Sequence, residues 1–429
     1  MEKQNITAYC NLIDKHNAHI QAFLPEQNRC TRLLNTLKKL SRKFPDPANR
    51  PLLFGVPVAV KDIYRVDGFD TACGSRLPTA LFAGPEASSV TRLKAAGALI
   101  LGKTVTTEFA WFQPGPTRNP RNTDYSPGGS SSGSAAAVAA GMAPVALGTQ
   151  TIGSVIRPAA YCGIVGVKPS AQSIPTDGII PFSSTFDQAG YFTRDIETAE
   201  RIASVICDEW APTAAAPPGN IIPEIEEGDN QVKTPLVIGI PDSSFLEQAD
   251  VQILNTFNHA LDILKNAGHR IVTTNLFADI KRINREHKAI AAREFAMVHA
   301  GWYAEYAHLY SEHSIKLIQE GREVPEGAVP AILSHRLAVQ KDLALRMDSE
   351  GIDLWLSPAA TSLPPKGLSS TGSPLMNLPW TFTGVPCITI PLNNTGLPLP
   401  AGLQCSGRMH ELKNLFVNVK ALESILGNV

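Results

Sequence analysis

Two serine-bearing segments flanked by glycines lie close together in this 429-residue chain, and they limit what it can fold into. Residues 127–134 read Pro-Gly-Gly-Ser-Ser-Ser-Gly-Ser, and residues 148–159 read Gly-Thr-Gln-Thr-Ile-Gly-Ser-Val-Ile-Arg-Pro-Ala. A short Ala-rich stretch separates them. Glycine lets backbone N–H groups approach a reacting atom that a side chain would otherwise block. The two segments therefore predict loops at which serine hydroxyls carry out chemistry.

A lysine is better placed than a histidine to activate these serines. No histidine occurs from Ile20 through Asn258, so a Ser-His-Asp site would have to take its base from the C-terminal half of the chain. Lys61 ends the apolar run Gly-Val-Pro-Val-Ala-Val-Lys of residues 55–61, which predicts a buried strand that carries an ammonium group inward. Burial disfavours the charged form of a lysine, so Lys61 can lose its proton there.

Composition excludes several other classes of protein. The formal net charge is −1, and the sequence has no run of basic residues of the kind that binds a phosphate backbone, so we expect no nucleic-acid partner. Seven scattered cysteines without a Cys-x-x-Cys pair favour a reduced compartment and no metal site. The polar N-terminus lacks a signal sequence, and the apolar stretch of residues 133–148 is too short to span a membrane. These features predict a soluble, cytoplasmic protein with no membrane partner, and we expect a homodimer.

Short apolar runs alternate with helical patterns from Leu52 onward, which predicts an α/β layered fold with its first strands at 56–60, 98–101 and 145–147. A hydrophobic content of 44% supports one main body over residues 1–429. Its expected parts are an N-terminal helical segment (1–45), a motif-bearing core (52–207), an exposed linker rich in Pro, Ala, Glu and Gly (208–235), and a C-terminal half that completes the sheet and the substrate pocket (236–429). In that half we expect strands at 236–240, 270–275, 353–356 and 384–391, and helices at 251–265, 279–310, 329–347 and 412–426.

Two alternative motifs are weaker. The run Gly129-Ser-Ser-Ser-Gly133 fits a nucleophile elbow centred on Ser131, but an elbow needs a strand before it, and residues 119–127 are rich in turn formers and proline. A phosphate-binding loop would need Gly-Lys followed by Ser or Thr after the glycines, and the sequence lacks this.

Three linked motifs instead resemble the amidase signature family, closest to its malonamidase-like branch. They are the strand ending at Lys61, the triple-serine run, and Gly-Thr-Gln-Thr-x-Gly-Ser-Val-Ile-Arg-Pro-Ala-Ala-Tyr-Cys-Gly. The resemblance is dense over residues 52–170 and continues in outline through 384–386 and 396–398. It implies a three-layer α/β/α sandwich with a large central mixed β-sheet, and catalysis without a cofactor or metal.

The resemblance also implies a Ser-cisSer-Lys triad. Ser154 corresponds to the nucleophile, Ser130 to the bridging residue in a cis peptide, and Lys61 to the base; the two serines stand 24 residues apart, as in the family. Ordinary lysine has a pKa of about 10.4, which must fall by about 3 for Lys61 to be neutral near pH 7. Backbone N–H groups of the loop Thr151-Ile152-Gly153-Ser154 would stabilise the oxyanion.

Several residues of these loops leave alternatives open. Ile152 replaces the small residue usual in the family, so it either forms part of an acyl-pocket wall or disturbs the oxyanion loop. Arg157 either holds a substrate carboxylate, as the malonamidase-like branch does, or forms an internal salt bridge. Gly129 and Ser131 are further candidates for substrate contact. Lys103 and Lys168 lie in sequence contexts similar to that of Lys61, but we expect them to be capping or surface lysines. Cys162 is expected to be a small buried apolar residue.

The predicted function is an amidohydrolase that cleaves the C–N bond of a small linear amide, which can bear a carboxylate, through an acyl-enzyme on Ser154. A rival is the glutamine-hydrolysing component of a tRNA-dependent amidotransferase, although that component usually has Ser-Ile-Arg where this chain has Ser-Val-Ile-Arg from Ser154 to Arg157. A third hypothesis, motivated by Ile152, is a relative that binds an amide or an acid without turnover.

Overall fold

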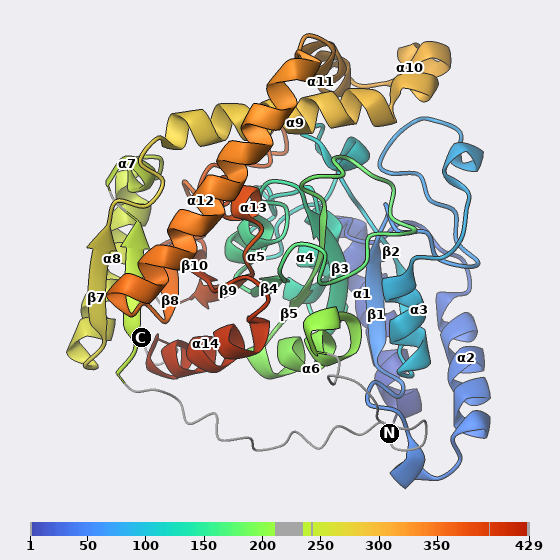
Figure 1. Ribbon diagram of the computed structural model, residues 1–429. Helices are drawn as coiled ribbons and strands as arrows, with labels where there is room; N and C mark the ends of the chain where they lie inside the picture. The colour runs from blue at the N-terminus through green and yellow to red at the C-terminus, as the bar shows by residue number, and fades with distance from the viewer. Residues whose placement is uncertain (1, 211–234, 242, 394, 427–429) are drawn as a thin grey trace, which may run out of the picture.

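A ten-stranded mixed β-sheet organises the computed structural model, which describes residues 2–210, 235–241, 243–393 and 395–426 (Figure 1). Its strand order is β2-β1-β3-β5-β4-β9-β10-β8-β6-β7. The strands are β1 (Pro57–Lys61), β2 (Leu99–Thr104), β3 (Val145–Gln150), β4 (Val165–Lys168), β5 (Gln188–Thr193), β6 (Val237–Pro241), β7 (Arg270–Thr274), β8 (Leu354–Pro358), β9 (Cys387–Leu392) and β10 (Ala401–Ser406).

Helices lie on both sides of this sheet (Figure 1). They are α1 (Glu2–Ile20), α2 (Arg29–Lys43), α3 (Ser88–Ala95), α4 (Ser132–Ala139), α5 (Ile156–Cys162), α6 (Ile196–Ile206), α7 (Ser243–Leu246), α8 (Val251–Asn266), α9 (Ile280–Val298), α10 (Ala300–Tyr306), α11 (Glu312–Arg322), α12 (Val329–Glu350), α13 (Leu378–Thr383) and α14 (Leu412–Leu426).

Strand β1 shows why the fold has three layers. All five of its residues are buried, because helices cover both faces of the sheet. Successive side chains point to opposite faces, so Val58 and Val60 join the core shared with α3, α6 and α14, whereas Ala59 joins the core shared with α1, α2 and α4. The predicted three-layer α/β/α sandwich with a central mixed sheet is confirmed.

The pairing of the strands places the functional segments at one edge of the sheet. Strand β1 lies between β2 and β3 and is parallel to both. The carboxyl ends of β1 and β3 therefore lie side by side, and Lys61 ends β1 where the loop of residues 151–155 leaves β3. Sites in open α/β sheets form beyond the carboxyl ends of parallel strands.

Some expected elements differ from the observed ones. The single helix expected at 279–310 is divided into α9 and α10, with His299 between them. Strands β4, β5 and β10 were not expected from the sequence; their glycine and polar residues give a weak strand signal, yet ladder pairing buries every residue. Most of the expected linker, residues 211–234, lies outside the described residues.

The prediction that Lys103 and Lys168 are capping or surface lysines is wrong. Lys103 is buried in β2 and forms an ion pair with Asp62 at 2.8 Å. Lys168 is fully buried in β4, where its Nζ donates to Gln188 Oε1 at 2.6 Å. Both lie on strands covered on both faces, so their charges have only internal partners. Among the residues described, none of the helices combines the length and apolar character needed to cross a bilayer.

Candidate active site

Lys61 and Ser130 form a buried hydrogen-bonded pair at the end of β1. Lys61 Nζ lies 2.8 Å from Ser130 Oγ and 2.8 Å from Thr149 Oγ1. The Lys61 side chain is fully buried, and Ser130 is 3% exposed. A neutral amine has two N–H bonds and one lone pair. It can therefore donate to Thr149 and accept the hydroxyl proton of Ser130.

Burial lowers the pKa of Lys61 to about 7, and the negative charge of Asp187 opposes part of this fall. No carboxylate among the described residues forms an ion pair with Lys61. A substantial fraction of the side chain is therefore uncharged near neutral pH, which is the state that a general base needs.

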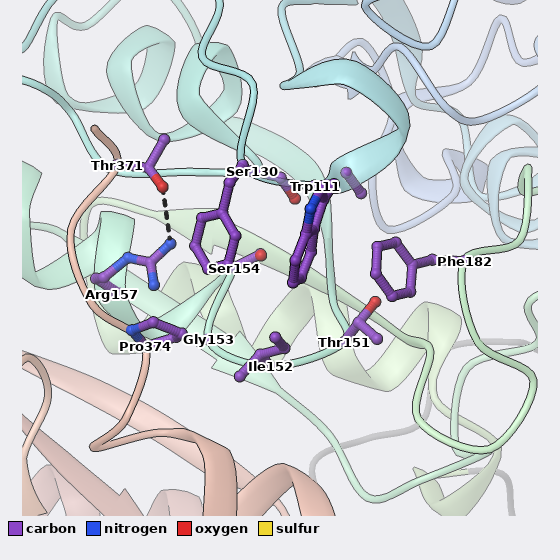
Figure 2. A pocket seen from close by; sticks show the side chains of 12 residues that line it. Trp111, Ser130, Thr151, Ile152, Gly153, Ser154, Arg157, Phe182, Thr371 and Pro374 are labelled. Atoms are coloured by element: carbon purple, nitrogen blue, oxygen red, sulfur yellow. Dashed lines mark hydrogen bonds between the residues drawn. The ribbon is translucent and has the colours of Figure 1, made fainter. Parts of the chain in front are cut away.

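Ser130 and Ser154 line the same pocket (Figure 2). Ser130 follows a cis Gly129–Ser130 peptide bond and precedes α4; Ser154 lies in the loop between β3 and α5. In the described structure no hydrogen bond joins the two hydroxyls, and Ser154 is 9% exposed, so solvent reaches it from the pocket. Catalytic hydrogen bonds are often long in unliganded sites and shorten when substrate binds.

The loop after β3 lines the pocket through Thr151, Ile152, Gly153 and Ser154. Ile152 is absent from the residues with positive φ, so its β-branched side chain is accommodated in ordinary backbone geometry and forms part of the pocket wall. A Cβ atom at Gly153 would lie 2.4 Å from Asn377 Oδ1, so the residue must be glycine for the loop to pack this closely.

The Thr151 side chain is tied to the body of the protein. Its hydroxyl donates to Asp187 at 2.6 Å, and Asp187 also accepts from the N–H groups of Phe182 and Ser183 at 2.7 and 3.0 Å. Burial raises the pKa of Asp187 to about 6, so the carboxylate is mostly ionised at neutral pH and accepts all three hydrogen bonds.

Arg157 lies in α5 at the pocket and is almost completely buried. Its Nη2 donates to Gly129 O at 2.7 Å and to Thr371 Oγ1 at 3.4 Å. Nε and Nη1 have no partner in the described part of the chain, and no salt bridge forms there, so the alternative of an internal salt bridge is not what the structure shows. Burial lowers the pKa of Arg157 to about 10, which leaves the guanidinium charged at neutral pH.

The pocket has a charged side and an aromatic side. Figure 2 shows Arg157 and Thr371 on one side of Ser154, and Trp111 and Phe182 on the other. The rings of Trp111 and Phe182 are in contact, with centroids 5.5 Å apart. The pocket contains about 310 Å³ of empty space, part of which is open to solvent, so it suits a compact acyl group.

The remaining predicted residues support the loops. The Ser131 hydroxyl bonds to the backbone of Thr149, and Ser131 is not among the residues that line the pocket. Gly129 contributes its carbonyl to Arg157, and a Cβ there would lie 2.8 Å from Thr371. The described residues just before Ser131 form turns rather than a strand, so the nucleophile-elbow alternative lacks its structural context. Cys162 is fully buried, as expected.

Several residues of the site were not identified from the sequence. Thr149 was within the second motif without an assigned role, whereas Asp187, Thr371 and the aromatic wall lie outside the motifs. Asp187 immediately precedes β5, whose own strand signal is weak. Thr371, Trp111 and Phe182 come from irregular segments that carry no periodic pattern.

A pH profile tests the protonation of Lys61. The rate of reaction of Ser154 with a small alkyl fluorophosphonate is expected to rise with pH and to level off above an apparent pKa of about 7. Below that pKa the amine binds a proton, so the rate should fall about tenfold for each further pH unit. Labelling reactions that are quenched at set times and analysed by intact-mass spectrometry give the rate at each pH. A rate that is constant from about pH 5.5 to about pH 9 would contradict the role of Lys61 as the base.

Fold and site together define an α/β protein with a buried lysine, two pocket serines and a loop of backbone N–H groups. The profile of the family described as Amidase matches residues 4–411, and the chain belongs to this family. Among solved structures, it resembles a protein described as an amidase (TM-score 0.85, 24% identity, covering 100% of this chain and 96% of the other). It also resembles a peptide amidase from Stenotrophomonas maltophilia (TM-score 0.79, 23% identity, covering 99% and 94%). At these identities the likeness concerns the fold.

Curated relatives carry the name of a component of glutamyl-tRNA(Gln) amidotransferase, its A subunit. The chain is 38% identical over 283 residues to this protein from Halorhodospira halophila, covering 62% of this chain and 57% of that protein. It is 36% identical over 246 residues to the corresponding protein of Persephonella marina, covering 56% and 50%. The matched region thus spans about half the length of these relatives.

Proposed function

We propose that this protein is an amidohydrolase that cleaves a small linear amide through a seryl acyl-enzyme. The observation that carries the proposal is the buried Lys61–Ser130 pair beside a pocket into which Ser154 is exposed. A serine is a weak nucleophile until a neighbouring base takes its proton. The pair provides such a base without a histidine.

The reaction follows from these positions. Neutral Lys61 accepts the proton of Ser130 as Ser130 accepts that of Ser154, and Ser154 Oγ attacks the amide carbonyl carbon. Loop N–H groups stabilise the oxyanion of the tetrahedral intermediate. The same relay returns the proton to the leaving nitrogen as the C–N bond breaks, and ammonia or an amine departs. Water then attacks the acyl-enzyme, with the relay again taking the proton, and releases the acid.

We further propose that the substrate bears a carboxylate held by Arg157. Two guanidinium nitrogens of Arg157 have no partner within the described residues, although both are buried at the pocket. A buried charged donor without an acceptor is costly, and the planar fork of a guanidinium matches a carboxylate. The half-amide of a small dicarboxylic acid satisfies both this donor and the limited space.

Substitution of Arg157 tests this specificity. Arg157→Gln is expected to lower kcat/KM for the half-amide of malonic acid about 10- to 100-fold, the effect of one lost charged hydrogen bond. The same variant should lower kcat/KM for the neutral diamide by a smaller factor, because that substrate loses only the support that Arg157 gives to Gly129 O. Ammonia release measures both rates. Equal losses for the two substrates would show that Arg157 only supports the fold of the loops, and Arg157→Lys tests whether charge alone suffices.

A second candidate function is glutamine hydrolysis within an amidotransferase, because the curated relatives are named as a component of such an enzyme. The extra residue between Ser154 and Arg157 argues against it. The two functions differ in assembly: we propose a cytoplasmic homodimer that is active alone, whereas an amidotransferase component would need a partner. Purification under mild conditions followed by native mass spectrometry distinguishes them. Ammonia release by the isolated homodimer supports the first, and a stable complex with a second protein, active only as that complex, supports the second.

A further inference from the structure

We infer that His287 and Thr381 are positioning residues that orient the peptide groups of the loop 151–154 toward the oxyanion. The inference rests on the proposed hydrolase function and goes beyond it. Both residues lie far from the loop in the sequence, His287 in α9 and Thr381 in α13. Neither lines the pocket, so each acts through the backbone that it binds.

His287 holds the carbonyl of Thr151. Its Nε2 lies 2.9 Å from Thr151 O, and a carbonyl oxygen can only accept, so Nε2 carries the hydrogen. The ring is fully buried and stacks on Phe186, with centroids 4.1 Å apart and planes inclined by 19°. Within the described structure Nδ1 has no partner. The contact with Thr151 is therefore the one hydrogen bond of this side chain there.

Thr381 holds the next carbonyl. Its hydroxyl donates to Ile152 O at 2.6 Å and accepts from Gln150 Nε2 at 3.0 Å. The carbonyl oxygen of the Gln150 side chain accepts from the N–H groups of Val155 and Ile156 at 2.9 and 3.0 Å. Thr381 thus connects the loop to the start of α5 as well as to α13.

These anchors also set the direction of the N–H groups. In a planar trans peptide, the carbonyl of one residue and the N–H of the next point in opposite directions. Holding Thr151 O directs the N–H of Ile152 away from α9, and holding Ile152 O directs the N–H of Gly153 away from α13. Gly153 O accepts from Arg157 N at 3.1 Å, which orients the N–H of Ser154 in the same manner.

The N–H groups of residues 152–154 are therefore directed away from their anchors, and all three residues line the pocket. No acceptor among the described residues takes these N–H groups. Oxyanion donors contribute most when they are fixed before negative charge develops. Loss of an anchor lets the peptide plane rotate, so it should slow the step that forms the oxyanion while leaving the fold and the pocket unchanged.

Phosphonylation of Ser154 by a small alkyl fluorophosphonate tests the inference without a known substrate, because it also builds negative charge on an oxygen. The full chain is compared in five forms: wild type, His287→Phe, His287→Gln, Thr381→Val and Thr381→Ser. Phenylalanine keeps the ring on Phe186 but has no donor, whereas glutamine keeps an N–H at similar reach. At position 381, valine keeps the branched shape of threonine without its hydroxyl, whereas serine keeps the hydroxyl without the methyl group.

We expect the second-order labelling rate to fall about 10- to 100-fold in His287→Phe and Thr381→Val, somewhat less than the loss of a whole oxyanion donor. His287→Gln and Thr381→Ser should recover most of the rate, and all four variants should unfold within a few degrees of the wild type. His299→Phe is the matched control: His299 is likewise buried, follows the last residue of α9 and forms a hydrogen bond with the Tyr310 hydroxyl at 2.9 Å, so its loss should leave the rate within about twofold.

The outcomes separate this inference from the proposed function. Wild-type protein that does not react overturns both. Wild-type protein that reacts, while His287→Phe and Thr381→Val react at the wild-type rate, overturns only the inference. The inference also fails if His287→Gln reacts as slowly as His287→Phe and Thr381→Ser as slowly as Thr381→Val. That result would mean that packing, rather than hydrogen bonding, determines the labelling rate. If His287→Phe does not fold, the comparison of Thr381→Val with Thr381→Ser tests the inference.

Discussion

Ser154→Ala is expected to abolish turnover, lowering kcat by about 10⁶-fold, which is the loss seen when the nucleophile of a serine hydrolase is removed. The Oγ atom that forms the acyl bond is absent, and Ser130 is less accessible to a substrate, because it is 3% exposed whereas Ser154 is 9% exposed. Two measurements check this: ammonia release from a panel of small amides, and intact mass after incubation with a fluorophosphonate. Neither product nor added mass should appear.

Ser132→Ala provides the matched control for this variant. Ser132 belongs to the same triple-serine run and is 4% exposed, but its hydroxyl has no hydrogen-bond partner among the described residues. Its removal should leave turnover within about threefold of the wild type. Turnover that persists in Ser154→Ala, or a label found on another residue of the wild type, would reject Ser154 as the nucleophile.

Lys61→Met is expected to lower kcat by about 10³- to 10⁴-fold and at the same time to stabilise the protein near neutral pH. Methionine has a similar shape but no base, and general-base catalysis contributes about this factor. The gain in stability arises because the buried amine must give up its proton or remain charged without a counter-ion. Thr149 and Ser130 lose a shared partner in the variant, which offsets part of the gain.

The pH dependence gives the sign of this stability effect. The pKa of Lys61 is 10.5 in the unfolded chain and about 7 in the folded protein, so the unfolded state binds more protons between these values. The wild type therefore gains stability as the pH rises from about 7 to 10.5, and the cost that Lys61→Met removes below pH 7 is about 5 kcal/mol. Thermal unfolding should show a higher Tm for the variant at about pH 6.5 and a much smaller difference at about pH 10. A lower Tm for the variant at the acidic pH would mean that the folded protein does not disfavour the charged form of Lys61.

The strands that could be predicted from the sequence are those with continuous branched apolar runs. Residues 56–60, 98–101 and 145–147 predicted β1, β2 and β3, with boundaries that differ by at most three residues. The missed strands β5 and β10 read Gln-Ala-Gly-Tyr-Phe-Thr and Ala-Gly-Leu-Gln-Cys-Ser. Their Gly, Ala and Gln residues weaken the strand signal, although β5 also contains Tyr, Phe and Thr, and each strand pairs with neighbours on both sides.

Local motifs identified the central residues of the site but not the residues that hold them. Lys61, Ser130 and Ser154 lie within dense patterns, so their types and spacing could be interpreted directly. His287 and Thr381 both lie in segments without a motif. Their role depends on how α9 and α13 pack against a loop more than 130 residues earlier, which the periodicity of one sequence does not encode.

The charge of the Lys61 amine is the most direct test of the proposed mechanism. Lysine labelled with ¹³C at Cε reports each amine by its NMR shift, and the resonance of Lys61 is the one that disappears in Lys61→Met. We expect this resonance to titrate with a pKa of about 7, well below those of the surface lysines. A Lys61 resonance that titrates near 10.5 would show a permanently charged amine, and the proton relay through Ser130 to Ser154 would have no base.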